Sequence, residues 1–188
     1  MTAARLPHQH TARFPIQGSF LIVGHGNQLR GDDAAGAQVA NAVARWNIPN
    51  VTAMTVHQLI PELAIEISRA DYVIFIDACG EDSHARSLQL SPISAPISAG
   101  TSNLPAAAHA ASSLTQSAQG LLALTKKVYG HKPQAWLLQV PTESFDFGKQ
   151  LSSTAQRGID KATQTIERFI INYRVPYPVV AESYIKSA

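Results

Sequence analysis

The stretch of sequence that decides the fold is Phe20-Leu-Ile-Val-Gly-His-Gly-Asn-Gln-Leu-Arg-Gly-Asp-Asp-Ala-Ala-Gly36. Its apolar start, residues 20–23, is typical of a buried strand, and a glycine turn follows it directly. A helix is predicted from about Asp33 to Trp46, ending before Pro49. The stretch therefore predicts a strand that leads through a glycine turn into a helix, as in α/β proteins.

The chain outside this stretch continues the alternation of short apolar runs with helical patterns. Further strands are predicted at residues 51–56, 72–76 and 135–140, with additional strand material at 87–90. Helices are predicted from Pro61, from Ser117 to a stop at Gly130, and from Ser153. This alternation predicts a parallel sheet that is covered by helices on both faces.

The two later helices have recognisable apolar faces. The inward face of the helix from Ser117 is predicted to consist of Leu121, Leu122, Thr125 and Val128. The last helix opens with Ser153 and Gln156 at the spacing of a capping box. Its buried side is predicted to consist of Ile159, Ala162, Ile166 and Ile170.

Composition and charge exclude several classes of protein. Charged residues make up 15% of the 188 residues, against roughly 25% in ordinary soluble domains, and the net charge is +2. The chain has no Lys/Arg cluster typical of nucleic-acid binding, and no apolar run approaches the roughly 18 residues of a bilayer-spanning helix. With one Cys and no signal peptide, we expect a single cytoplasmic domain over residues 1–188, with an N-terminal extension at 1–18 and a C-terminal tail at 173–188.

The missing charge is concentrated in one segment. Residues 87–125 contain no Asp, Glu, Lys or Arg, and within them residues 91–113 are rich in Ser, Ala and Pro without any periodicity. This pattern predicts a long neutral loop over residues 91–113, which carries His109. Loops of this length inside compact domains are usually functional or mobile.

Polar residues that directly follow the predicted strands are the candidates for chemistry, because open α/β sheets bind ligands beyond the carboxyl ends of their strands. They are Asn27, Asp32, Asp33, His57, Gln58, Asp77, Cys79, Thr142 and Glu143. Asp33 and Asp77 would reach the same crevice, where two close carboxylates either share a proton or bind a metal. A metal site would take an imidazole from His25, His57, His84 or His109. The structural alternative is that Asp33 caps a helix and Asp77 ends a strand.

Two other functions have less support in the residues. A dinucleotide site requires Gly-x-Gly-x-x-Gly, but Leu29 occupies the third glycine position and no acid ends the second predicted strand. Cys79 paired with a His would resemble a cysteine nucleophile. A lone Cys near a strand end, however, is more often a small buried apolar residue.

Three segments together resemble the hydrogenase maturation proteases, the endopeptidases that trim the C-terminus of the [NiFe]-hydrogenase large subunit. The opening stretch Phe20–Gly36 is the most specific, because its glycine turn, Asn and paired acids occur together. Asp71-Tyr-Val-Ile-Phe-Ile-Asp-Ala78 is similar to the family's third-strand motif. Gln134-Ala-Trp-Leu-Leu-Gln-Val-Pro141 and Phe145-Asp-Phe-Gly-Lys-Gln-Leu-Ser152 resemble its late strand and the entry to its final helix. The resemblance extends from about residue 20 to residue 170.

This resemblance implies a three-layer α/β/α fold with a twisted, mostly parallel sheet of about five strands. It implies a metal-dependent endopeptidase without a Ser or Cys nucleophile, whose partner is the large-subunit precursor and whose nickel is supplied by that substrate. Asp33 and Asp77 would be the catalytic metal contacts, and Gly26, Asn27 and Asp32 would bind the substrate.

The third metal ligand of the family, a His, has no direct counterpart in this chain. The resemblance places that ligand at Leu114, and His109 is the only imidazole nearby that could replace it. We therefore expect His109 either to act as the third metal contact or to be an ordinary exposed histidine of the loop. The alternative is a relative that binds the precursor or nickel as a maturation checkpoint and does not cleave.

Overall fold

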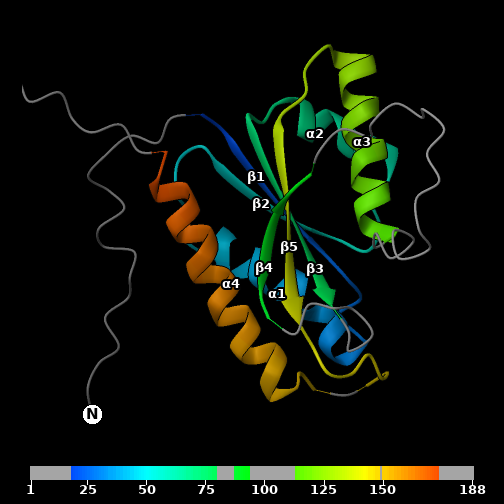
Figure 1. The fold of residues 1–188 in the computed structure, drawn as a ribbon, viewed down its shortest axis with the longest axis vertical. Coiled ribbons are helices and arrows are strands. Elements are labelled where there is room, and N and C mark those ends of the chain that lie inside the picture. The colour runs from blue at the N-terminus through cyan, green and yellow to red at the C-terminus, as the bar shows by residue number, and fades with distance from the viewer. Residues whose placement is uncertain (1–17, 80–86, 94–112, 149, 174–188) are drawn as a thin grey trace, which may run out of the picture.

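A five-stranded sheet forms the centre of the described part of the chain, which in this computed structural model comprises residues 18–79, 87–93, 113–148 and 150–173. The strands are β1 Phe20–His25, β2 Val51–Val56, β3 Tyr72–Cys79, β4 Gln89–Pro92 and β5 Gln134–Pro141. The helices are α1 Ala35–Ala44, α2 Ala64–Ser68, α3 Ser113–Tyr129 and α4 Ser153–Ile171. Short 3₁₀ turns at Gly31–Ala34 and Pro61–Leu63 precede α1 and α2 (Figure 1).

The strand order β2-β1-β3-β5-β4 places β1 between the two strands that follow it in sequence. β1, β2, β3 and β5 are parallel, whereas the edge strand β4 runs antiparallel to β5. The chain leaves β1 for β2 on one side and then returns to β3 on the other side. In such a sheet the carboxyl ends of β1 and β3 form the crevice in which ligands bind.

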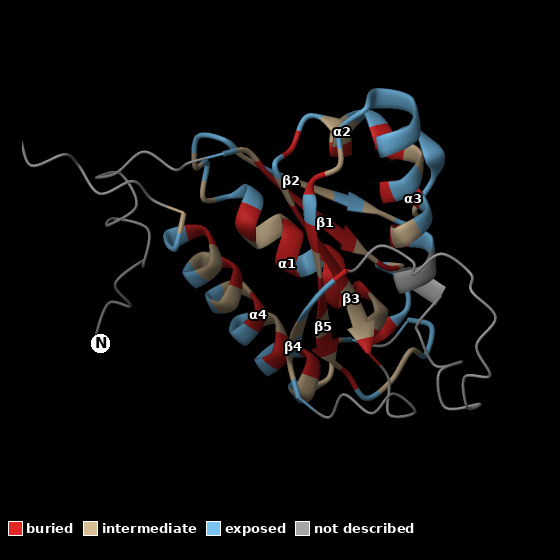
Figure 2. Cartoon of the chain, turned by 45° about the horizontal axis from the view of Figure 1, so that its top comes forward, coloured by how far each residue is buried: buried red, intermediate tan, exposed pale blue. Residues whose placement is uncertain are grey.

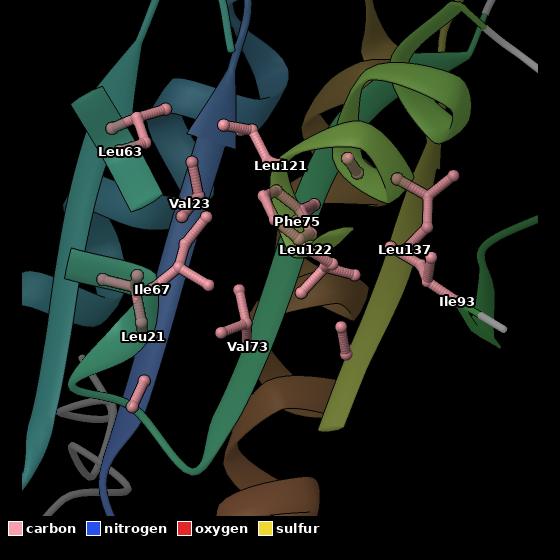
Figure 3. Packing of buried hydrophobic residues seen from close by; sticks show 13 residues of the cluster. Leu21, Val23, Leu63, Ile67, Val73, Phe75, Ile93, Leu121, Leu122 and Leu137 are labelled. Carbon is pink, nitrogen blue, oxygen red and sulfur yellow. The ribbon is translucent and has the colours of Figure 1, made fainter. Parts of the chain in front are cut away.

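Helices cover both faces of the sheet, as the alternating sequence pattern predicted (Figures 1 and 2). α2 and α3 pack on one face, where Ile67 and Leu122 meet Val23 and Phe75 of the strands (Figure 3). α1 and α4 cover the other face, and their buried side chains pack on the strands in a second cluster. That cluster includes Phe20, Ile22, Val39, Val43, Ile74, Ile76, Leu138, Ala162, Ile166 and Ile170. The three-layer α/β/α architecture is therefore confirmed.

The third strand is longer than its apolar run predicted. β3 continues beyond Ile76 because its parallel pairing with β5 extends to Cys79, which lies opposite Pro141. Asp77 is therefore a residue of the strand, paired with Gln139, and does not follow it. The additional strand predicted at 87–90 is present as β4, shifted by two residues.

The helices begin and end at positions that differ from the predicted ones. α1 starts at Ala35, after the 3₁₀ turn, and stops at Ala44, so that Trp46 lies outside it. α4 is capped by Ser152, whose hydroxyl accepts a hydrogen bond from the amide of Ala155, and the predicted capping box at Ser153 is therefore wrong by one residue. The short helix after Pro61 buries Leu63 and Ile67 as predicted.

α3 also differs from its prediction at both ends. It begins at Ser113, four residues before the predicted start, so Ser113 is helical and does not belong to a loop. Leu121, Leu122 and Thr125 are buried as predicted, but Val128 is 59% exposed, because the end of the helix extends past the core. Gly130, with a φ of +71°, follows the helix and ends it as predicted.

The predicted loop and termini lie largely outside the described residues. Ser91 and Pro92, which were expected in the neutral loop, form the end of β4, while residues 94–112 are not described. Tyr173, expected to start the tail, packs on Tyr72 with ring centroids 4.2 Å apart, so the fold extends to this residue. Within the described residues, no helix is both long and apolar enough to cross a membrane.

Candidate functional site

His25 and Asp77 meet at the carboxyl ends of β1 and β3. The parallel register pairs Gly24 with Ile76, which makes His25 and Asp77 the next residues along the two strands. Their side chains come together with the ring Nδ1 of His25 3.3 Å from Oδ1 of Asp77. Both are partly exposed, at 25% for the His25 side chain and 17% for that of Asp77. The pair is therefore partly open to solvent at the carboxyl ends of these two strands.

The glycines of the opening stretch bring the start of α1 against the strand ends. A Cβ at Gly36 would lie 2.3 Å from the carbonyl oxygen of His25 and 2.7 Å from that of Ile76. Gly26 has a φ of +136°, and a Cβ there would lie 1.8 Å from the carbonyl oxygen of Asp33. Only glycine fits such close approaches between backbones. The spacing of these glycines thus places Asp33 next to the end of β1.

Asp33 lies in the 3₁₀ turn and faces back toward the glycine turn. Its Oδ2 accepts a hydrogen bond of 3.0 Å from the backbone amide of Asn27. The Asn27 side chain in turn accepts one of 2.9 Å from the amide of Leu29, which closes an Asx turn. Neither the 3₁₀ turn nor α1 has a side-chain cap. The alternative in which Asp33 serves as a helix cap is therefore wrong.

Asp32, the neighbouring acid, is buried and has a structural position. It is 1% exposed, and its two oxygens accept hydrogen bonds from the amides of Glu143, Ser144 and Ser152 and from the hydroxyl of Ser152. These bonds join the first turn to the segment that enters α4. The substrate contact predicted for Asp32 therefore lacks support, since its oxygens face the protein interior.

Burial and hydrogen bonding act on the pKa of Asp32 in opposite directions. Burial alone would raise that pKa, because it disfavours the charged form. The hydrogen bonds from Glu143, Ser152 and Ser144 act in the opposite direction and together lower the pKa of Asp32 below its ordinary value. Asp32 is thus held as a carboxylate inside the protein.

Two acids affect the pKa of the His25 imidazole. The hydrogen bond to Asp77 raises the pKa of His25 above its usual value, while burial of the ring opposes that change. The negative charges of Asp77 and Asp33 raise it further, as does the backbone carbonyl of His57. His25 therefore lies close enough to Asp77 and Asp33 for the charges of both to act on its ring.

The side chains of the other predicted residues do not join this site. Cys79 is buried, as expected for a small apolar residue, and is not placed as an exposed nucleophile. The Thr142 hydroxyl donates to the carbonyl of Cys79, and Glu143 contacts Thr154 through its carboxylate. His57 is exposed just beyond β2.

Two of the candidate imidazoles, His84 and His109, lie outside the described residues, so the prediction that His109 is the third metal contact stays a prediction. Leu114 is the second residue of α3. Among the described residues, no group of three or more His, Cys, Asp or Glu side chains is placed to hold a metal ion.

His25 is the site residue that sequence reasoning passed over. It was one of several candidate imidazoles, and no pattern within the sequence singled it out. The signal that could have identified His25 is the register between β1 and β3. Because Gly24 pairs with Ile76 in these parallel strands, the next residues, His25 and Asp77, lie side by side. This register depends on pairing between segments 52 residues apart, which a single sequence does not reveal.

Similarity to solved structures supports the fold. HybD, a [NiFe] hydrogenase maturation protease from Thermococcus kodakarensis, is similar with a TM-score of 0.62 and 21% identity, over 81% of this chain and 99% of that chain. The hydrogenase maturating endopeptidase HybD from E. coli is similar with a TM-score of 0.61 and 17% identity, over 85% of this chain and 98% of that chain. HycI, a [NiFe] hydrogenase maturation protease from T. kodakarensis, is similar with a TM-score of 0.59 and 19% identity, over 82% of this chain and 93% of that chain. No family model and no curated protein matches the sequence. At these identities the similarity establishes a shared fold.

Proposed function

We propose that this chain is a [NiFe]-hydrogenase maturation endopeptidase, which hydrolyses one peptide bond to remove the C-terminal extension of a nickel-loaded large-subunit precursor. The observation that carries the proposal is that Asp77 contacts His25 at the carboxyl ends of β1 and β3, with Asp33 in the turn directly after β1, in a chain that has the maturation-protease fold. Asp33 and Asp77 would recognise the nickel that the precursor already holds, so that the metal belongs to the substrate.

The hydrogen bonds of the two acids support this role. Asp33 uses Oδ2 to bind the Asn27 amide, and Asp77 uses Oδ1 to bind His25. Within the described residues, no hydrogen bond occupies the second oxygen of either carboxylate. Each acid therefore has one oxygen that fixes its orientation and one that can contact a cation. Carboxylate oxygens and imidazole nitrogens both serve as ligands of divalent transition metals.

The remaining contacts of the site would come from its first turn and from His109. Asn27 and Gly26 shape the turn beside Asp33 and would contact the precursor. His109 precedes Ser113, the residue at which α3 begins, and we keep it as the third metal contact of the proposal. α3 begins at the same edge of the sheet as the carboxyl ends of the parallel strands (Figure 1).

A cleavage assay with a purified nickel-loaded precursor tests this function. Loss of the C-terminal peptide is followed by mass spectrometry for the wild type, Asp33→Ala, Asp77→Ala and the control Asp160→Ala, which alters an exposed residue of α4. We expect the wild type and the control to cleave and the two site variants to lose cleavage. Wild-type rates in Asp33→Ala or Asp77→Ala would overturn the assignment.

The alternative function is a maturation checkpoint that binds the precursor or nickel and does not cleave. It is motivated by Leu114, which stands where the resemblance places the third ligand. Under this alternative the wild type captures the loaded precursor intact, and His109→Ala leaves the mass of the precursor unchanged. Cleavage by the wild type that is lost in His109→Ala would exclude the checkpoint and support the endopeptidase.

A further inference from the structure

We propose that His25 is a positioning residue, which fixes the carboxylate of Asp77 so that one defined oxygen faces the substrate. The inference rests on the proposed function, and it adds a residue to the two acids and the His109 contact of that function. His25 acts through Asp77 and not through contact with the reacting peptide bond.

The contact between the two side chains has a defined direction. A carboxylate can only accept hydrogen bonds, so Nδ1 of His25 is the donor and Oδ1 of Asp77 is the acceptor, at 3.3 Å. Within the described residues, His25 is the only hydrogen-bond partner of the Asp77 side chain. The orientation of this carboxylate therefore depends on the imidazole.

The backbone of His25 is held firmly enough to serve as a support. His25 is the last residue of β1 and pairs with Val56 of β2. The next amide, that of Gly26, donates a 3.2 Å hydrogen bond to the carbonyl of Val56. On the other side Gly36 of α1 approaches so closely that a Cβ there would lie 2.3 Å from the His25 carbonyl oxygen. A side chain on such a rigid strand end can hold its partner in a fixed geometry.

Asp33 shows the same arrangement with a different donor. The Asn27 amide donates to one oxygen of Asp33, and the His25 ring donates to one oxygen of Asp77. Most substitutions of Asn27 leave its backbone amide in place, whereas any non-histidine residue at position 25 removes the imidazole. Groups of this kind, which orient a metal-contacting side chain, typically change metal affinity or activity by about 10–100-fold when removed.

Substitutions at position 25 separate positioning from simple packing. His25→Leu keeps an apolar side chain of similar size but removes the donor, whereas His25→Asn retains an N–H close to the position of Nδ1. We expect kcat/KM for the loaded precursor to fall by about 10–100-fold in His25→Leu and to recover to within about fivefold of wild type in His25→Asn. The matched control is His131→Leu, since His131 contacts the Ala70 carbonyl outside the site.

A double-mutant cycle identifies Asp77 as the residue through which His25 acts. In an Asp77→Ala background, which does not cleave, the affinities of His25→Leu and His25→Asn for the loaded precursor should be equal, because the partner is gone. A loss of cleavage in His25→Asn as large as that in His25→Leu would contradict the proposal, as would wild-type kcat/KM in His25→Leu.

A measurement on the free protein distinguishes failure of this inference from failure of the proposed function. Long-range ¹H–¹⁵N spectra report which ring nitrogen of neutral His25 carries the proton. The signals of the His25 ring are assigned as those that are absent from the spectrum of His25→Asn. We expect the Nδ1–H tautomer in the wild type and its loss in Asp77→Ala. An Nε2–H tautomer in the wild type, unchanged in Asp77→Ala, would overturn the positioning role. If the wild type fails to cleave while the Nδ1–H result holds, only the proposed function fails.

Discussion

Asp32 and Ser152 are joined by two hydrogen bonds, although they lie 120 residues apart in the sequence. The Ser152 amide donates to Oδ1 of Asp32 at 2.6 Å, and the Ser152 hydroxyl donates to Oδ2 at 2.7 Å. The same hydroxyl accepts the bond from Ala155 that caps α4. One buried carboxylate thus connects the turn that carries Asp33 to the start of the last helix.

Removal of this carboxylate should destabilise the whole fold. In Asp32→Ala the amides of Glu143, Ser144 and Ser152 lose their acceptor in a partly buried region, where unpaired donors are costly. We expect the free energy of unfolding to fall by about 2–4 kcal/mol. Urea denaturation measures this free energy. The control is Asp160→Ala, which alters an exposed residue and whose free energy of unfolding is expected to lie within about 0.5 kcal/mol of the wild-type value. A similarly small change in Asp32→Ala would show that these bonds contribute little.

The lowered pKa of Asp32 predicts a loss of stability in acid. Because the folded-state pKa lies below the ordinary value, the unfolded chain binds more protons as the pH falls, and folding becomes less favourable. The contribution of Asp32 is present above about pH 4 and is lost as the pH falls through the folded-state pKa. We expect the stability difference between wild type and Asp32→Ala to shrink from about pH 6 to pH 3. A difference that stays constant over this range would contradict the prediction.

The close approach at Gly36 predicts intolerance of any side chain. In Gly36→Ala the new Cβ would meet the backbone carbonyls of His25 and Ile76, which cannot move without breaking the sheet. We expect a loss of several degrees in thermal midpoint, or failure to fold, together with loss of any site activity. The matched variant is Gly120→Ala in α3, where no atom lies within 4 Å of the new Cβ.

Gly120→Ala should have the opposite effect on stability. Gly120 lies at an exposed position in the middle of α3, and alanine is the better helix former there by about 0.5–1 kcal/mol. Differential scanning calorimetry of both variants compares the two glycines directly. Equal thermal midpoints for Gly36→Ala and Gly120→Ala would show that the packing of α1 on β1 and β3 is looser than described.

Much of the fold could be predicted from the sequence, because the deciding signals are local. The apolar runs located β1, β2, β3 and β5, and the opening stretch predicted the turn into α1. The errors at Asp77 and Ser153 have a different cause. β3 extends past Ile76 through pairing with β5, and Ser152 caps α4 while also donating to Asp32. Such long-range contacts determine where an element ends but leave no local pattern.

The candidate site could be predicted only in part, for the same reason. Asp33 and Asp77 follow from strand ends and the resemblance, but their supporting groups do not. The two adjacent acids, Asp32 and Asp33, look equivalent in sequence, and only the fold shows that the first is buried and bonded to a segment more than 100 residues away. His25 likewise becomes distinct only when β1 and β3 are in register.

The most direct test of nickel recognition by Asp33 and Asp77 is the rate of peptide release from nickel-loaded and nickel-free precursor, measured side by side. We predict that the wild type releases the C-terminal peptide from the loaded form alone, and that Asp33→Ala and Asp77→Ala release it from neither form. Equal release from both forms by the wild type, or wild-type release from the loaded form by either variant, would contradict the role of these two carboxylates.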